Sequence, residues 1–457
     1  MKKLFFISLT LIFLSTQAQE NFPLPTNAQK QWQDMEFYLF VHFGPNTFTG
    51  EEWGSGKEKA ELFNPTQLDC NQWCKIAKAA GAKGIILTAK HHDGFCLWPS
   101  KFSNHTVKQS IWENGNGDVL KKLSIACKTY GLKMGVYLSP WDRNHPDYGT
   151  AKYNDVFINM MKEVVSNYGP FFEFWWDGAN GESSNGKKQI YDWKRFEQTM
   201  RNIAPNTILF SDIGPDARWV GNENGIAGTT NWNNLDTATF TRGLGAPSTK
   251  SLNEGNENGK AWIPAECDVS IRPGWFYHST ENNKVKTPQQ LFNLYLKTVG
   301  RGANFLLNVP PNTKGLFNAE DSASLIDFKK LLDDNFKNNL LKNAMLQTVV
   351  QKNKRLEIER REISYQLLLK NTEKINCIVL KENMKNGQLI KQATVSIGNN
   401  GEVVKQIFIT TVGRKRILTF PAVNANEVVI VITHAKAKPA LQNIEGYLID
   451  ESLIEKQ

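Results

Sequence analysis

Beyond its first 18 residues the sequence contains no apolar run long enough to cross a bilayer, so we expect no membrane span in the mature chain. The long run near the start, LFFISLTLIFL, follows Lys2 and Lys3 and is too short for a membrane anchor. Thr16 and Ala18 supply the small residues of a cleavage site. We therefore predict a signal peptide over residues 1–18 and an exported protein, either periplasmic or secreted.

Cysteine is scarce, and none of the six cysteines forms a CxxC pair, which argues against a zinc module built on cysteine. They stand in helical or apolar segments, and we expect most of them to be small buried side chains: Cys70, Cys74, Cys96, Cys127, Cys267 and Cys377. The formal charge of +9 is dispersed and accompanies no nucleic-acid recognition motif. A solvated surface therefore explains the charge better than a nucleic-acid interface.

Aromatic residues, by contrast, are concentrated in FFEFWWDGAN, residues 171–180, which ends on a carboxylate. Alternate residues of a strand share a face, so Glu173, Trp175 and Asp177 are expected on one side and Phe174 and Trp176 on the other. Two largely apolar faces suit a parallel strand covered by helices, and barrel enzymes place catalytic groups at the C-terminal ends of such strands. The alternative is that Asp177 only caps a following helix.

The chain divides into two regions that differ in their predicted secondary structure. From residue 36 to about 335, buried-strand patterns alternate with helical ones in about eight units, which predicts a (β/α)8-like (TIM) barrel over residues 19–338. Its later units are expected to be distorted, because glycine- and asparagine-rich loops dominate residues 213–285. Short β-rich runs without tryptophan follow, and we predict a C-terminal antiparallel β-sandwich over residues 339–457 as an accessory domain.

Polar and aromatic residues follow several predicted barrel strands: His42, His91, His92, Trp141 and Asp177, with Glu52 and Trp53 in the first loop. In a barrel these positions converge on one pocket. Histidine and carboxylate could ligate a metal, but neighbouring histidines on a strand point to opposite faces, and we expect no metal. The other reading is glycoside hydrolysis, with Asp177 as one carboxylate and Glu223, or Glu266 with Asp268, supplying the second.

Six motifs carry a resemblance to a known family: FVHFGPNTFTGEEWG, ILTAKHHDGFCLWPS, GVYLSPWDRNHPDYG, FEFWWDGANGE, PAECDVSIRPGWFYH and GRGANFLLNVPPNTKGLF. Together they run from about residue 36 to 320, and the sequence resembles the glycoside hydrolases of family 29, the α-L-fucosidases. The resemblance implies a fucosylated oligosaccharide or glycoconjugate as substrate and a retaining mechanism that requires no cofactor. It also implies Asp177 as the nucleophile. The implied fucose-binding residues are His42, Glu52, Trp53, His91, His92, Trp141, Trp175 and Arg218.

The acid/base residue is a less direct transfer, because its position varies across the family. SPWDRNHPDYG and PAECDVSIRPGWFYH resemble the subgroup that prefers α-1,3/1,4-linked fucose on branched, Lewis-type glycans. In that subgroup the acid/base lies in the loop that here reads ARWVGNENG, which implies Glu223, although a glutamate on a flexible loop can also be without function. Glu266 is the runner-up, and it is otherwise expected to contact the aglycone sugars with Asp268 and Arg272.

Three other functions stay open at this point. They are an α-L-fucosidase of broad linkage specificity, a barrel that binds fucose without cutting it, and a glycosidase for another sugar. The presence of both Asp177 and Glu223 argues against the second, and HHDGF together with EEW argues against the third.

Overall fold

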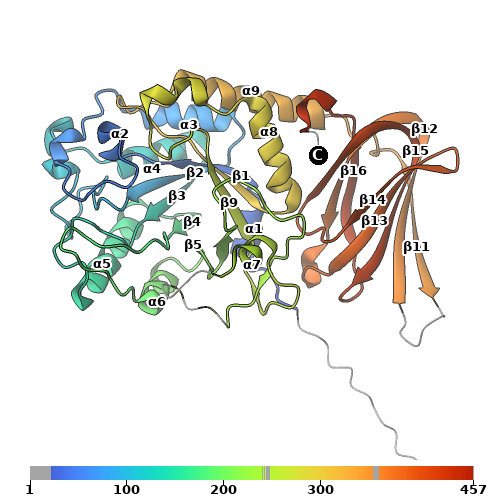
Figure 1. Ribbon diagram of the computed structural model, residues 1–457, viewed down its shortest axis with the longest axis horizontal. Coiled ribbons are helices and arrows are strands. Elements are labelled where there is room, and N and C mark those ends of the chain that lie inside the picture. The colour runs from blue at the N-terminus through green and yellow to red at the C-terminus, as the bar shows by residue number, and fades with distance from the viewer. Residues whose placement is uncertain (1–21, 239, 241, 243–246, 354–359, 456–457) are drawn as a thin grey trace, which may run out of the picture.

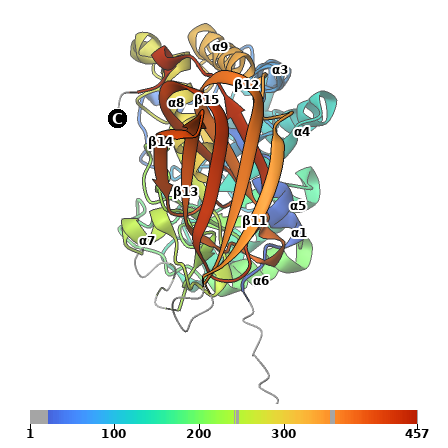
Figure 2. The same cartoon turned by 90° about the vertical axis from the view of Figure 1, so that its right-hand side faces the viewer.

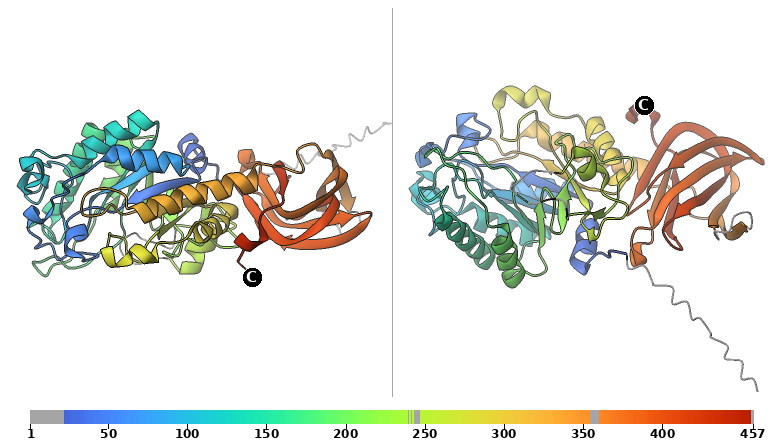
Figure 3. Two further views of the ribbon diagram at one scale, coloured as in Figure 1. Left: turned by 90° about the horizontal axis from the view of Figure 1, so that it is seen from above. Right: turned by 60° about the horizontal axis from the view of Figure 1, so that its bottom comes forward.

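The computed structural model describes residues 22–238, 240, 242, 247–353 and 360–455. An N-terminal barrel lies beside a C-terminal β-sheet domain (Figure 1). The helix α9 (Ala319–Phe336) runs along the barrel toward the sheet domain (Figure 3). The expected boundary after residue 338 falls between this helix and the first strand of the second domain, β11 (Met345–Asn353). The predicted signal peptide lies outside the described residues and stays a prediction.

Eight parallel strands close into a barrel in the order β1-β10-β9-β6-β5-β4-β3-β2, which confirms the predicted TIM-like architecture. The strands are β1 (Phe37–Val41), β2 (Gly84–Lys90), β3 (Lys133–Leu138), β4 (Glu173–Trp175), β5 (Ile208–Ser211), β6 (Ala217–Trp219), β9 (Ala265–Ser270) and β10 (Asn304–Asn308). Because they are parallel, their C-terminal ends meet at one rim, and the loops that follow them share that rim.

Helices surround the barrel and begin where the sequence offers caps. The Asp118 side chain accepts from the Lys121 N–H at the start of α4, and Thr287 caps α8 with Pro288 in its first turn. The helices are α1 (Asn27–Gln33), α2 (Asn46–Thr49), α3 (Cys70–Ala79), α4 (Val119–Tyr130), α5 (Ala151–Tyr168), α6 (Trp193–Ile203), α7 (Thr249–Glu254), α8 (Pro288–Lys297) and α9. Within the described part of the chain, no helix is both long and apolar enough to cross a bilayer.

The later barrel units are distorted, as expected. Only residues 212–216 join β5 to β6, and no helix lies between them. Within residues 260–266, KAWIPAE, lies β8 (Ala261–Trp262), which pairs with β7 (Asn234–Leu235) outside the barrel. The barrel strand is the next one, β9. The helix α6 starts after its cap Asp192, and Ile190, which precedes the cap, is 88% exposed.

The two faces of β4 separate as the alternation predicts. Phe174 and Trp176 pack in the large apolar cluster between the strands and the helices. Trp175 packs instead in the cluster inside the barrel, with side chains such as Tyr38 and Phe210. All six cysteines are buried thiols.

The second domain is an antiparallel sheet, as predicted, with strand order β11-β12-β15-β13-β14 and β16 paired to β12 (Figure 2). The two layers of its core come from one folded sheet, because both halves of the long strands β12 and β15 contribute to the same apolar cluster. The runs RILTF and NEVVIVIT are consecutive parts of β15. The strands are β12 (Arg360–Glu382), β13 (Ile390–Asn399), β14 (Glu402–Ile409), β15 (Arg416–Ala435) and β16 (Leu441–Tyr447).

Candidate active site

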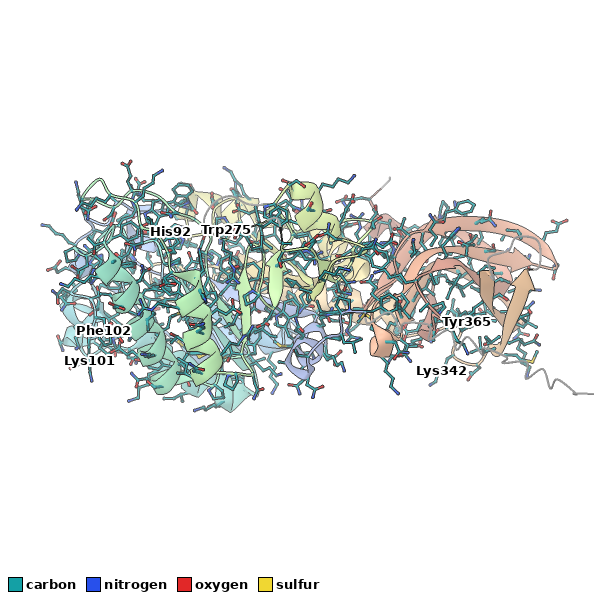
Figure 4. All side chains as sticks on the ribbon, turned by 90° about the horizontal axis from the view of Figure 1, so that it is seen from below. His92, Lys101, Phe102, Trp275, Lys342 and Tyr365 are labelled. Carbon is teal, nitrogen blue, oxygen red and sulfur yellow. The ribbon has the colours of Figure 1, made fainter. Side chains whose placement is uncertain are left out.

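A small cavity of about 130 Å³ lies at the C-terminal rim of the barrel. Nine of the residues expected at the site line it: His42, Glu52, Trp53, His91, His92, Trp175, Asp177, Glu223 and Asp268. Phe40, Tyr137, Ala179 and Trp275 complete the wall, and Figure 4 shows His92 and Trp275 near each other on the barrel. A larger hollow of about 620 Å³ lies beside α6, but none of the expected site residues lines it.

Asp177 projects into this cavity two residues beyond β4. The Tyr137 hydroxyl donates to its Oδ2 over 2.9 Å, and the Ala179 N–H donates to its Oδ1 over 2.8 Å. His92 Nε2 lies 3.6 Å from Oδ2. The helix that follows is capped by Asp192, so Asp177 is not a helix cap. These donors orient a carboxylate that keeps one side open to the cavity.

The three histidines of the wall are neutral hydrogen-bonding groups. Burial lowers the pKa of His42 to about 3 and that of His92 to about 4, and it lowers the pKa of His91 well below its usual value. His42 Nδ1 lies 2.9 Å from Asn308 Oδ1, an acceptor, so the proton is on Nδ1 and Nε2 is free to accept. His92 Nδ1 is likewise paired with the Ser139 hydroxyl over 2.8 Å.

Both members of the histidine pair line the cavity, which corrects the expectation that they point to opposite faces. Strand alternation does not apply to them, because β2 ends at Lys90 and the chain turns there. Their rings stand 4.2 Å apart. Over the described ranges, no three His, Cys, Asp or Glu side chains are grouped so that they could hold a metal ion.

The loop that contains Trp275 ties two glutamates to the rim. The Trp275 backbone N–H donates to Glu52 Oε2 over 2.9 Å, and His278 Nε2 lies 2.8 Å from Glu52 Oε1. The Trp275 indole Nε1–H donates to Glu223 Oε2 over 3.3 Å. Glu223 itself is exposed on the loop after β6. Trp53 is 58% exposed, and Trp141, which does not line the cavity, packs behind it and against His92.

Comparisons with known proteins agree on one family. A sequence model of the α-L-fucosidases matches residues 15–337. Alpha-L-fucosidase 1 of Arabidopsis thaliana is 38% identical over 449 residues, covering 93% of this chain and 88% of the plant protein. The chain belongs to glycoside hydrolase family 29, the α-L-fucosidases.

Solved structures of this family have the same fold. A glycoside hydrolase 29 family member from an unknown rumen bacterium superposes with a TM-score of 0.86 at 39% identity, covering 94% of this chain and 78% of the other. A family 29 fucosidase of Ruminococcus gnavus, solved in complex with fucose, superposes with a TM-score of 0.84 at 29% identity. That match covers 95% of this chain and 96% of the other.

Sequence reasoning missed the four wall residues Phe40, Tyr137, Ala179 and Trp275, and it missed Asn308, which braces His42. Tyr137 stands on β3 between Val136 and Leu138, which pack outside the barrel, so a period of two places Tyr137 inward. Asn308 ends β10 and orients His42, and Trp275 stands in a loop with no regular pattern. The sequence pattern could have indicated Tyr137, by strand alternation, and Asn308, as a polar residue at a strand end, but not Trp275.

Arg218 does not reach the sugar cavity, and this expectation is corrected. Its neighbour Trp219 points inward and donates to Asp268 Oδ1 over 2.8 Å, so Arg218 points out of the barrel. The buried guanidinium donates to the carbonyls of Leu252, Ile263 and Trp232, and to Asn231 Oδ1. These bonds join Arg218 to buried residues of three neighbouring chain segments.

Glu266 is also outside the cavity and lies deeper in the barrel, fully buried. Trp175 Nε1–H donates to its Oε1 over 2.8 Å, and the Tyr38 hydroxyl donates to its Oε2. This position corrects both expectations for Glu266, as an alternative acid/base and as an aglycone contact. Asp268, two residues further along β9, does reach the cavity wall.

Arg272, also expected at the aglycone, instead forms a buried ion pair with Asp321 on α9. Its Nε lies 3.0 Å from both carboxylate oxygens, and both side chains are fully buried. We expect Arg272→Met to destabilise the protein by about 3–5 kcal/mol, because an uncompensated buried charge remains. Chemical denaturation measures the loss, and the KM for an aryl α-L-fucoside should stay unchanged. A raised KM with intact stability would return Arg272 to the substrate site.

Proposed function

We propose that the protein is a retaining exo-α-L-fucosidase in which Asp177 is the nucleophile and Glu223 the acid/base. The observation that carries this proposal is the meeting of the two carboxylates in one small cavity, although they come from the loops after β4 and β6. Retaining glycosidases need two such groups, roughly 5–5.5 Å apart, on either side of the scissile bond.

The proposed reaction has two displacements. Asp177 Oδ attacks the anomeric carbon, the bond to the glycosidic oxygen breaks, and Glu223 gives its proton to that oxygen. Glu223, now ionised, then takes a proton from water, and the water oxygen attacks the same carbon and releases Asp177. The hydrogen bonds from Tyr137 and Ala179 suit the charged form of Asp177, which must be ionised at the start.

The wall of the cavity suits one deoxy sugar. The neutral rings of His42, His91 and His92 offer hydrogen-bonding nitrogens for hydroxyl groups, and Trp175 and Phe40 offer apolar surface for the ring face and the methyl group. The small volume favours a single terminal residue over an internal one, which supports exo action.

For linkage we propose α-1,3/1,4-linked fucose on branched, Lewis-type glycans. This rests on the sequence resemblance of the loops around Trp141 and Trp275 to the linkage-restricted subgroup. The alternative is a broad-specificity α-L-fucosidase, which the corrected positions of Glu266 and Arg272 favour, because they remove two of the three expected aglycone contacts.

Release of free fucose from three substrates tests the linkage. A Lewis-type trisaccharide, an α-1,2-fucosylated lactose and an aryl α-L-fucoside are compared with wild type and Asp177→Ala. We expect rapid, Asp177-dependent release from the branched trisaccharide and slow release from the fucosylated lactose. Similar rates on both would overturn the restricted linkage and leave the fucosidase activity in place.

A further inference from the structure

Two carboxyl groups meet inside the barrel, directly beneath the sugar cavity. Glu173 on β4 and Glu266 on β9 are both fully buried. Glu266 accepts from Trp175 and Tyr38, and Glu173 Oε2 accepts from the Trp32 indole of α1 over 2.7 Å. Glu173 Oε1 has no hydrogen-bond partner, and the groups that neighbour the Glu173 carboxyl are the Glu266 carboxyl and the Tyr38 hydroxyl.

The groups that act most strongly on this pair are acidic or neutral. The titratable groups that face the pair are Tyr38 on β1 and Asp268 on β9. Burial, reinforced by the charge of Glu266, raises the pKa of Glu173 well above its usual value, and burial raises the pKa of Glu266 to about 7. Two adjacent carboxylates in such a place cannot both be ionised.

We propose that Glu173 and Glu266 hold one proton between them and act together as positioning residues for Trp175, the aromatic wall of the fucose cavity. Protonated Glu173 donates to ionised Glu266, which then accepts the Trp175 indole N–H. This inference rests on the proposed fucose site, because it assigns the pair a role in binding the sugar there.

Trp175 contacts Tyr137, which in turn contacts the proposed nucleophile Asp177. Its ring stacks on Phe210, with centroids 4.2 Å apart, and on Tyr137, with centroids 5.3 Å apart. Tyr137 is the residue that donates to Asp177. Glu173 and Trp175 are alternate residues of β4, and Asp177 follows two residues beyond its end.

The pair should make fucose binding depend on pH. Glu173 has a higher pKa in the folded protein than in the unfolded chain, so its contribution to stability is present at low pH and is lost as the pH rises. Loss of the shared proton places two charges beneath Trp175 and disturbs its acceptor. The affinity for fucose should therefore fall as the pH rises through the raised pKa of Glu173.

Calorimetric titration of L-fucose between pH 5 and 9 tests the proposal without requiring turnover. In Glu266→Leu the indole loses its acceptor, and we expect Kd to rise about ten- to a hundredfold at every pH. Glu266→Gln retains an acceptor oxygen and should bind nearly as wild type at pH 6. Glu173→Gln is permanently neutral, so the alkaline rise in Kd should disappear.

Glu382 provides a matched control in the other domain. It is buried, burial raises its pKa to about 7, and it accepts backbone N–H groups from Leu389, Ile390 and Gly413. Glu382→Gln should leave the fucose Kd and its pH dependence unchanged. Infrared difference spectra add a direct readout, since Glu173→Gln should remove one carboxylic acid band that wild type shows at neutral pH.

The outcomes are distinct. An unchanged alkaline rise in Glu173→Gln, or no loss of an acid band, overturns the shared proton. Equal weakening by Glu266→Gln and Glu266→Leu overturns the positioning role, and the Gln variants decide the matter if Glu266→Leu does not fold. A wild type that neither binds nor hydrolyses fucosides contradicts the proposed function instead, and the infrared band still tests the proton.

Discussion

Asp177→Ala is expected to lower kcat on an aryl α-L-fucoside by at least about a thousandfold, because the variant lacks the carboxylate proposed to form the covalent intermediate. The variant should fold normally, since the Asp177 side chain is 23% exposed and caps no helix. Initial rates of aryl alcohol release, with circular dichroism to check the fold, measure the effect.

Azide rescue of Asp177→Ala and a control variant at Asp212 test the same assignment further. Azide entering the space left by the side chain should attack the anomeric carbon directly, restore turnover and give β-L-fucosyl azide, the inverted product. Asp212 lies at the end of β5 against Gly178, and burial, followed by the charge of Asp177, raises its pKa to about 6. Asp212→Asn should keep most of the activity. A greater loss of activity in Asp212→Asn than in Asp177→Ala would show that Asp177 is not the nucleophile.

The position of Asp177 was predictable because it follows from local geometry. A period of two and a buried strand place Glu173, Trp175 and Asp177 on one face without any knowledge of neighbouring strands. The same holds for the caps Asp118 and Thr287, whose partners stand three residues away. Features that depend on a few adjacent residues can be read directly from the sequence.

Arg218, Arg272 and Glu266 could not be placed in this way. Whether Arg218 faces the cavity depends on β6, a three-residue strand in a segment that lacks a strand pattern. Arg272 is held by Asp321, which is 49 residues further along the chain. Glu266 faces inward as expected, but its depth in the barrel is set by its register with Asn304 on β10. The position of each of these side chains depends on contacts with residues that are distant in the sequence.

Glu223→Gln is expected to slow release of fucose from the branched trisaccharide by about a hundred- to ten-thousandfold, the usual contribution of general acid–base catalysis. A sugar leaving group needs the proton of Glu223, whereas a strongly acidic phenol does not. The defect in formation of the fucosyl-enzyme should therefore be much smaller on an activated aryl fucoside, and a burst of phenol should precede slow turnover. Stopped-flow measurement of the burst separates the two steps.

The stereochemistry of azide rescue then assigns the role. In Glu223→Gln, azide should attack the fucosyl-enzyme that Asp177 has formed, and two inversions yield α-L-fucosyl azide, whereas Asp177→Ala yields the β product. Asp268→Asn is the matched control, because Asp268 lines the same cavity but already accepts from Trp219. If Asp268→Asn gives the α-azide and Glu223→Gln does not, the acid/base is Asp268. The two products together would show that one cavity holds two carboxylates with different tasks, which is what retention requires.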